Sequence, residues 1–377
     1  MKINFPVKRG DQIRAHYLFF IIVGIQVGAG FLSAPRYIFK EAQQDAWISI
    51  LIAYLFMILI VMVMFKILSR YENADIFGIH VALFGKWFGK FLGIIFLLFF
   101  MAELLSILLS YIEIVQIFIY PTIPSSVMGG LMLILVFYSV IGGIRIVTGV
   151  VFLFVILSPW FFPLLYDPIL RMETSHFFPI LEASPTDLLK GARTTVYSFL
   201  GLEILFVIYP FIDNKQRAKF PTYLGLTVSA LVVLTTTIVS IGYFSPNDFD
   251  LLDWPVISLF KSVSFTFMER FDYFVVAEWM MVTVPTAILI MWAITYGTKR
   301  LFQVEEKITL TVVTLILLPL FSLINTVVEI QKVTDIIGKI GFWIVFVYPF
   351  ILFPIVLLKT KRQEEKKDVQ YEKRNPH

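Results

Sequence analysis

The chain has 377 residues, of which 58% are hydrophobic and only 15% are charged, whereas a typical soluble domain carries roughly 25% charged residues. Together with 39 Phe and a mean hydropathy of +0.84, this leaves too little polar surface to cover a globule in water. The composition excludes a soluble enzyme and a disordered chain. It predicts an all-α protein that crosses the membrane several times.

Several common chemistries lack the residues that would support them. The chain has no Cys, so disulfides, thiolate metal sites and cysteine nucleophiles cannot occur. Its four His are far apart, and it has neither a G-x-S-x-G nor a G-x-x-x-x-G-K-[ST] motif. The net charge of +4 collects in short loops and in the C-terminal tail, which argues against a nucleic-acid partner. We expect no metal, no cofactor and no enzymatic activity.

Ten apolar stretches follow one another along the chain, each close to the roughly 20 residues that a transmembrane helix needs. The first follows a basic lead, as in a signal peptide, but it is too long and lacks an A-x-A cleavage pattern, so we expect a retained helix. A cytoplasmic lead (1–14) precedes the stretches and a charged cytoplasmic tail (359–377) follows them. The stretches cover residues 15–35, 46–66, 91–116, 126–142, 146–166, 193–212, 221–244, 273–297, 308–328 and 336–358.

The distribution of Lys and Arg predicts the orientation of these helices. With the N-terminus in the cytoplasm and the loops alternating, 22 of the 31 Lys and Arg residues fall on the cytoplasmic side and 9 on the outer side. The outer segment 247–253 is acidic and has no basic residue, which fits the same arrangement. We therefore expect both termini in the cytoplasm.

The ten stretches divide into two sets of five, residues 15–166 and 167–358, and an odd number per set makes the second set run inverted. Many secondary transporters are built in this way, with broken helices that meet near the membrane midplane. Both the first and the sixth stretch contain glycines that weaken a helix by about 1 kcal/mol each. These are Gly24, Gly28, Gly30 and Gly201. We expect both stretches to unwind, although close helix packing in lipid would also explain the glycines.

Two unwound helices would point backbone amides into one shared cavity, where the N-termini of the half-helices favour a carboxylate. We therefore predict a ligand-binding site that both segments form. Its residues are Val27, Gly28, Ala29, Gly30 and Phe31 in the first stretch and Ser198, Phe199, Leu200 and Gly201 in the sixth.

Ionisable residues inside apolar stretches are costly in a bilayer and indicate a functional site. Glu103 occurs in the middle of the third stretch, and Ser106, Ser110 and Glu113 follow it within about an 80° arc of a helix, forming one polar stripe. Glu203 lies in the middle of the sixth stretch. Because burial penalises the charged form of an unpaired carboxyl, these Glu residues are candidate proton carriers. A neutral Glu that braces a broken helix is the alternative, and it suits Glu203 especially well.

The eighth stretch contains Thr283 and Thr286 on either side of Pro285. The proline frees a backbone carbonyl one turn earlier, which together with the Thr hydroxyls could face a cation or a substrate. A simple kink is the alternative. Tyr296, one turn from Trp292 near the cytoplasmic end, is a candidate gate residue.

The segment VGAGFLSAPR, the short basic lead before it, ten stretches in a chain of this length and the centre of the sixth stretch resemble a known family. They are similar to the B subunits of bacterial spore germinant receptors, the GerAB-type proteins of the amino acid–polyamine–organocation superfamily. The resemblance covers residues 11–359. It implies two inverted five-helix repeats, as in bacterial leucine transporters, with helices one and six broken. It also implies residence in the spore inner membrane and assembly with an A-type subunit and a C-type lipoprotein subunit.

The resemblance implies a germinant-sensing subunit that binds an amino acid, nucleoside or sugar and thereby shifts a larger complex toward an active state. The alternative is a secondary transporter that carries a small metabolite, such as an amino acid, coupled to protons or sodium. The residues do not separate these functions, because both need the same midplane pocket. A structural subunit with a vestigial pocket is a third interpretation.

Overall fold

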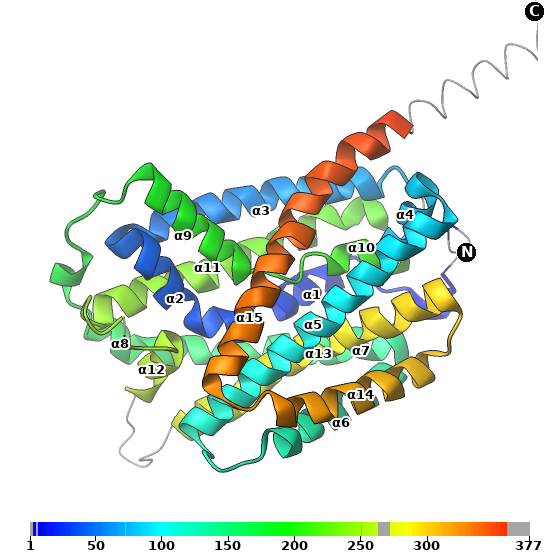
Figure 1. The fold of residues 1–377 in the computed structure, drawn as a ribbon. Helices are drawn as coiled ribbons and strands as arrows, with labels where there is room; N and C mark the ends of the chain where they lie inside the picture. The colour runs from blue at the N-terminus through cyan, green and yellow to red at the C-terminus, as the bar shows by residue number, and fades with distance from the viewer. Residues whose placement is uncertain (1–2, 5–6, 72, 250, 263–271, 360–377) are drawn as a thin grey trace, which may run out of the picture.

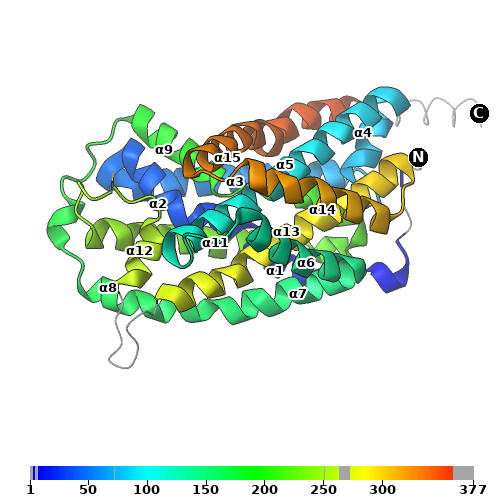
Figure 2. The same ribbon diagram turned by 60° about the horizontal axis from the view of Figure 1, so that its bottom comes forward.

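The computed structural model describes residues 3–4, 7–71, 73–249, 251–262 and 272–359, and the regular structure of these segments is helical. The one β-type backbone pairing among them joins Ile13 to Ile212. The helices pack side by side into a bundle with α1 in its interior (Figures 1 and 2). The all-α fold class predicted from composition is therefore confirmed.

The first half of the chain forms a run of helices that ends in a 3-10 segment, Ser158–Leu165. In order, the helices are α1 (Tyr17–Gln26), α2 (Ala29–Ala42), α3 (Ala46–Leu68), α4 (Ile76–Phe84), α5 (Lys86–Phe118), α6 (Ser125–Ile141) and α7 (Gly143–Leu157).

The second half follows a connection that contains α8 (Tyr166–Leu170). Its last helix, α15, continues through a π-helical turn (Phe342–Val347) to Lys359. In order, the helices are α9 (Pro185–Tyr197), α10 (Ile204–Ile208), α11 (Lys219–Tyr243), α12 (Pro255–Lys261), α13 (Asp272–Phe302), α14 (Glu306–Leu323) and α15 (Val327–Gly341).

The order of elements repeats between the two halves. Each begins with a broken helix (α1–α2 and α9–α10), followed by a long helix (α3 and α11), a short one (α4 and α12), a second long one (α5 and α13) and two more (α6–α7 and α14–α15). The matching helices α5 and α13 run antiparallel. Tyr111 near the end of α5 donates to the carbonyl of Val276 near the start of α13 (3.4 Å), and Gly93 near the start of α5 packs on Leu301 near the end of α13. The two halves are therefore inverted, while their boundaries at 166 and 358 stay a prediction.

Segments that the charge count assigns to the cytoplasmic side meet at one end of the bundle, called the inner end below. Basic side chains there bind segments that are distant in the sequence: Arg145 donates to the carbonyls of Arg9 and Gln12, Lys215 to Asn73, Arg300 to Asp75, and Lys359 to the carbonyls of Ala82 and Leu83. At the opposite, outer end, Arg36 pairs with Asp253. The grouping of the loops agrees with the charge count, and the direction across the membrane stays a prediction.

The surface of the bundle suits a bilayer. Seven helical segments among the described residues are long and apolar enough to cross a membrane, and α1 and α6 are shorter apolar helices. Large apolar side chains lie on the outside, such as Leu55 (64% exposed), Leu98 (60%) and Ile134 (64%). Exposing such apolar side chains to lipid costs little free energy, whereas exposing them to water is unfavourable. The chain is a multi-pass membrane protein.

Some helix boundaries differ from the prediction. The last helix starts at Val327 and not at 336, and the ninth ends at Leu323 and not at 328. Charged residues between 329 and 339 make this segment look too polar for a helix in a bilayer. Thr326 and Glu329 form a capping box that starts the helix, however, and Gln331, Thr334, Asp335 and Lys339 line a cavity. The apolar stretches also miss α4 and α12, which are too short to span the membrane.

Candidate ligand-binding site

The first break separates α1 from α2. The backbone at Val27 (φ −81°, ψ 72°) and Gly28 (φ −113°, ψ −160°) is not helical, so carbonyls at the end of α1 lose their helical partners. One of them, the carbonyl of Gly24, accepts a hydrogen bond from the hydroxyl of Thr286 in α13 (2.7 Å). A helix of the second half therefore holds the first break in place.

The three glycines of the first stretch differ in their roles. Gly28 lies in the break itself. A Cβ on Gly24 would lie 3.1 Å from the side chain of Val151, so close helix packing explains this glycine. Gly30 lies in the first turn of α2, where the nearest group to an added Cβ is the Cα of Ser198, at 3.7 Å. Gly30 therefore faces the second break.

The second break separates α9 from α10. Gly201 in this turn has φ +105°, a conformation that residues with a Cβ rarely adopt. Its N–H donates to the carboxylate Oε2 of Glu203 (3.0 Å), so Glu203 satisfies a backbone group that the break leaves free. Both breaks lie where the sequence predicts them.

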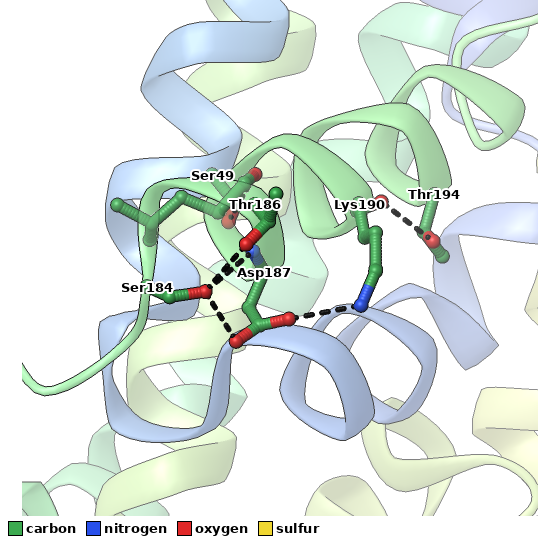
Figure 3. A network of polar contacts seen from close by, with 7 residues as sticks. Ser49, Ser184, Thr186, Asp187, Lys190 and Thr194 are labelled. Carbon is green, nitrogen blue, oxygen red and sulfur yellow. Dashed lines mark hydrogen bonds and ion pairs between the residues drawn. The ribbon is translucent and has the colours of Figure 1, made fainter.

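A polar network fixes the outer end of α9, the helix that leads into the second break (Figure 3). The hydroxyl of Ser184 accepts from the backbone N–H of Asp187 (3.2 Å) and donates to its carboxylate (2.6 Å), and Lys190 Nζ lies 3.0 Å from the same carboxylate. The Ser184 hydrogen bond and the Lys190 charge hold the pKa of Asp187 below its ordinary value of 3.8. Ser49 of α3 donates to the carbonyl of Leu188 (3.0 Å) and so ties α9 to α3.

A cavity of about 340 Å³ lies between the two breaks, within the range of small-molecule sites. It is bounded by α1, α2, α5, α9, α13 and α15 and extends toward the outer end, where the pair formed by Arg36 and Asp253 lies on its wall. Its charged lining residues are Arg36, Lys339, Glu103, Glu113, Asp253 and Asp335. The cavity therefore offers partners for both signs of charge.

Predicted site residues from both breaks, from α5 and from α13 line this cavity together. They are Gly28, Gly30, Ser198, Leu200, Glu103, Ser106, Ser110, Glu113 and Thr286. Residues that are far apart in the sequence therefore meet, and their role in binding stays a prediction.

Other predicted residues of the two breaks point elsewhere. Val27 and Phe31 line a second, largely apolar cavity of about 310 Å³, to which α7 and α11 also contribute. Phe199 is fully buried in the core, and an added Cβ on Gly201 would lie 2.6 Å from the side chain of Ile25. The second break is thus packed against α1.

The proline segment of α13 contributes less to the cavity than its sequence suggests. α13 continues through Pro285 without a break. The hydroxyl of Thr283 is buried and donates to the carbonyl of Trp279 in the same helix (3.0 Å), so Thr286 alone of the two predicted Thr residues faces the cavity. Ala29 begins α2, but its side chain lies outside the described atoms.

The polar stripe of α5 faces α15. Ser106 donates to the hydroxyl of Thr334 (3.2 Å), and the carboxylate of Glu113 accepts from the amide of Gln331 (3.4 Å). This stripe therefore faces protein and the cavity instead of lipid, as the helical spacing predicts.

Glu103, at the inner end of the stripe, lies beside Glu203 of the second break. Both are almost fully buried, at 4% and 1% exposed. Two carboxylates so close together would repel each other strongly in such a buried setting. Oε2 of Glu103 has no hydrogen-bond partner within the described segments. The cavity thus reaches the second break through a pair of carboxyls.

Tyr296 lies nearer the inner end of the bundle, about 15 Å along α13 from the cavity-lining Thr286. Its hydroxyl donates to the buried carboxylate of Asp75 (2.6 Å), to which Arg300 Nε also donates (2.6 Å). Its ring stacks on Trp292 at 5.4 Å. Tyr296 is therefore part of a packed cluster between the cavity and the inner end, and its role as a gate stays a prediction.

Several lining residues escape the sequence patterns. Gln26 is a single amide in an apolar stretch, and a lone polar residue at bilayer depth is the signal that would have found it. The polar residues of α15 recur at helical spacing, which marks one face of the helix, but the stretch boundaries exclude most of them. The missed residues include Gln26, Arg36, Asp253, Gln331, Thr334, Asp335 and Lys339.

Two inverted halves, each opened by a broken helix that faces a shared cavity, form an architecture found in many secondary transporters. Solved structures share it. A Na+-coupled sialic acid symporter in a substrate-bound outward-open state matches with a TM-score of 0.62 at 13% identity, covering 93% of this chain and 77% of the symporter. Mhp1, a nucleobase-cation-symport-1 family transporter, matches with a TM-score of 0.63 at 10% identity, covering 99% and 96%. The chain therefore has the leucine-transporter fold.

Within this class, the chain belongs to the spore germination protein family, whose sequence profile matches residues 12–330. Spore germination protein GerQB of Bacillus cereus is 30% identical over 350 residues, which cover 93% of this chain and 97% of GerQB. Spore germination protein YndE of Bacillus subtilis (strain 168) is 24% identical over 350 residues, covering 92% and 96%. The family resemblance found in the sequence is confirmed.

Proposed function

We propose that the protein is the germinant-sensing subunit of a spore nutrient receptor and that a small nutrient binds in the cavity between the helix breaks. The observation that carries this proposal is the cavity itself. It is lined by both breaks, by the polar stripe of α5 and by the charged pair at its outer end, in a chain of the spore germination protein family. An amino acid, a nucleoside or a sugar is of suitable size for such a site.

The start of α2 is the better place for a ligand carboxylate. Amides in the first turn of a helix have no partner within that helix, and the helix dipole favours a negative charge there. At the second break, by contrast, the carboxylate of Glu203 already accepts from the Gly201 amide. A ligand at the start of α2 contacts the first break, and its binding shifts the equilibrium between two positions of α1 and α2 at that break.

The setting of the protein is part of the proposal. The subunit lies in the spore inner membrane with both termini in the cytoplasm, acts without catalysing a reaction and assembles with an A-type subunit and a C-type lipoprotein. The Cys-free chain permits a labelling test at two exposed residues, Asn247 at the outer end and Lys307 at the inner end. A membrane-impermeant thiol reagent should label Asn247→Cys but not Lys307→Cys from outside. The reverse pattern would overturn the orientation.

The test of nutrient sensing uses Gly30→Val. Gly30 lines the cavity, and an added Cβ would lie 3.7 Å from its nearest neighbour, so the methyl groups of Val reduce the space for the ligand. Spores with this variant should need at least tenfold more nutrient to germinate at a normal protein level. Gly149→Val is the matched control, because nothing lies within 4 Å of a Cβ at this position of α7. An unchanged dose-response of the Gly30 variant at normal abundance would exclude the cavity as the binding site.

A secondary transporter is the second candidate, because the matched structures are a Na+-coupled symporter and a cation symporter. Membrane vesicles that contain the protein separate the two functions. Saturable, gradient-driven uptake of a nutrient in vesicles without partner subunits would favour transport. Nutrient binding without uptake would favour sensing.

A further inference from the structure

Gln26 ends α1 at the first helix break and is one of the residues that line the cavity. It is 3% exposed, yet neither its Nε2 nor its Oε1 has a hydrogen-bond partner within the described segments. Buried polar side chains in folded proteins are nearly always paired, and an exception calls for an explanation. Gln26 therefore carries one unused acceptor and two unused donors, which are buried at the wall of the cavity.

The chain pairs comparable amides elsewhere. Gln116 at the end of α5 donates to the carbonyl of Ile123 (2.9 Å) and to the hydroxyl of Ser125 (3.1 Å), and Gln331 of α15 donates to Glu113 (3.4 Å). Both of those amides support the protein's own structure. The amide of Gln26 pairs with nothing in the described chain, so it can pair with a molecule that enters the cavity.

The chemistry of the amide restricts that molecule. A carboxylate only accepts hydrogen bonds and an ammonium group only donates them, so either would leave half of the Gln26 amide unpaired. A group with a donor beside an acceptor pairs with both halves at once, as a carboxamide does and as glutamine does with the edge of adenine. Glu103 also lines this cavity, and its Oε2 is likewise buried without a partner within the described segments, so it is a second acceptor for a donor on the ligand.

We infer that Gln26 determines the specificity of the site by pairing with a ligand group that carries a hydrogen-bond donor next to an acceptor, such as a carboxamide or the edge of a nucleobase. This inference rests on the proposed sensing function and specifies its ligand class. The charged ends of a zwitterionic ligand bind elsewhere in the cavity, at the start of α2 and at the acidic residues of its wall. A site that pairs such a group discriminates strongly against ligands that lack it.

The experiment compares germination of spores with the full receptor on matched ligand pairs. Glutamine against methionine tests the carboxamide, and adenosine against purine riboside tests the base edge. In at least one of the two pairs, the wild type should respond to the ligand that carries the donor and acceptor (glutamine or adenosine) at a concentration at least tenfold lower than to the ligand that lacks them (methionine or purine riboside). Gln26→Met keeps the size of the side chain but has no amide, so this preference should fall below threefold. Gly149→Ala, remote from the cavity, should keep it.

Each other result counts against the inference. A preference that survives in Gln26→Met shows that another residue reads the ligand, and an equal loss for all ligands shows that Gln26 supports the site without reading it. Failure of Gln26→Met to accumulate shows that the amide supports the fold. These outcomes leave the sensing function intact. That function fails instead if Gly30→Val changes no nutrient response at normal abundance.

Discussion

At the second break, between α9 and α10, Glu203 pairs with the Gly201 amide and the turn packs closely on Ile25. At the first break, between α1 and α2, no comparable carboxylate from the break itself pairs with the described backbone. There, Thr286 of α13 donates to the carbonyl of Gly24, and the buried amide of Gln26 has no hydrogen-bond partner within the described segments.

The difference separates a braced break from an open one. The second break satisfies its own backbone and has little room for change, so it acts as a fixed wall of the cavity. The conformation of the first break depends on the hydrogen bond from Thr286 of α13 and, in the proposed function, on the ligand in the cavity. In the proposed sensing function, the ligand therefore acts mainly on α1 and α2, and their movement against the second break would carry the signal.

The sharpest way to test this comparison is to add a side chain at each break. Gly201→Val forces a residue with a Cβ into a positive φ, at about 1–3 kcal/mol, and overpacks Ile25 at a further cost of about 1–3 kcal/mol. We expect the variant to disappear from the membrane fraction on an immunoblot. Gly28→Ala is the control, because its nearest contact would be 3.7 Å away at a negative φ. Equal abundance of the two variants would remove the distinction.

The second prediction removes the brace. Glu203→Leu leaves the Gly201 N–H buried without an acceptor, which costs about 1–3 kcal/mol. The purified protein in detergent should unfold at a lower temperature. Glu203→Gln keeps a carbonyl acceptor of the same length and should unfold close to the wild-type temperature. If both variants unfold at the same lowered temperature, the loss of the carboxylate of Glu203, and not the loss of its hydrogen bond to Gly201, destabilises the protein.

The breaks and the polar stripe could be predicted from the sequence because their causes are local. The positive φ at position 201 favours a glycine, and the polar residues from Glu103 to Glu113 recur at the period of a helix. Composition alone was sufficient to predict an all-α membrane protein. These features depend on residues that are near each other in the chain.

The rest depends on contacts between distant segments. Gln26 carries no periodic signal, and its importance follows from where α5 and α15 place the cavity wall. The start of the last helix is hidden because a charged segment is costly in lipid but not beside a polar cavity. Asp75 pairs with Tyr296 and Arg300 across 221 and 225 residues, so only the packed structure reveals that cluster.

The third prediction concerns Glu103, where the braced break meets the cavity. Glu103→Gln keeps the shape and the hydrogen-bonding capacity but cannot release a proton, so it should accumulate normally and fail to trigger germination if the carboxyl pair exchanges a proton during signalling. Glu103→Leu should also fail. Germination assays at matched abundance measure both. A Gln variant with normal germination would give Glu103 a bracing role, and normal germination of Leu would remove it from the site.

The smallest effect is expected at the outer end of α9, which supports the braced break from a distance. Because Ser184 and Lys190 lower the pKa of Asp187 in the folded protein, its contribution to stability is present above the unfolded value of 3.8 and is lost as the pH falls through the lower folded value. Asp187→Asn should therefore slightly lower the unfolding temperature of the purified protein at pH 7, and the difference from wild type should shrink toward pH 3. Because the carboxylate is at the surface, salt should weaken the effect. A difference that stays constant from pH 7 to pH 3 would mean that the side chain acts by shape alone, and the support of the second break would then come from Ser49 and the packing of α9 on α3.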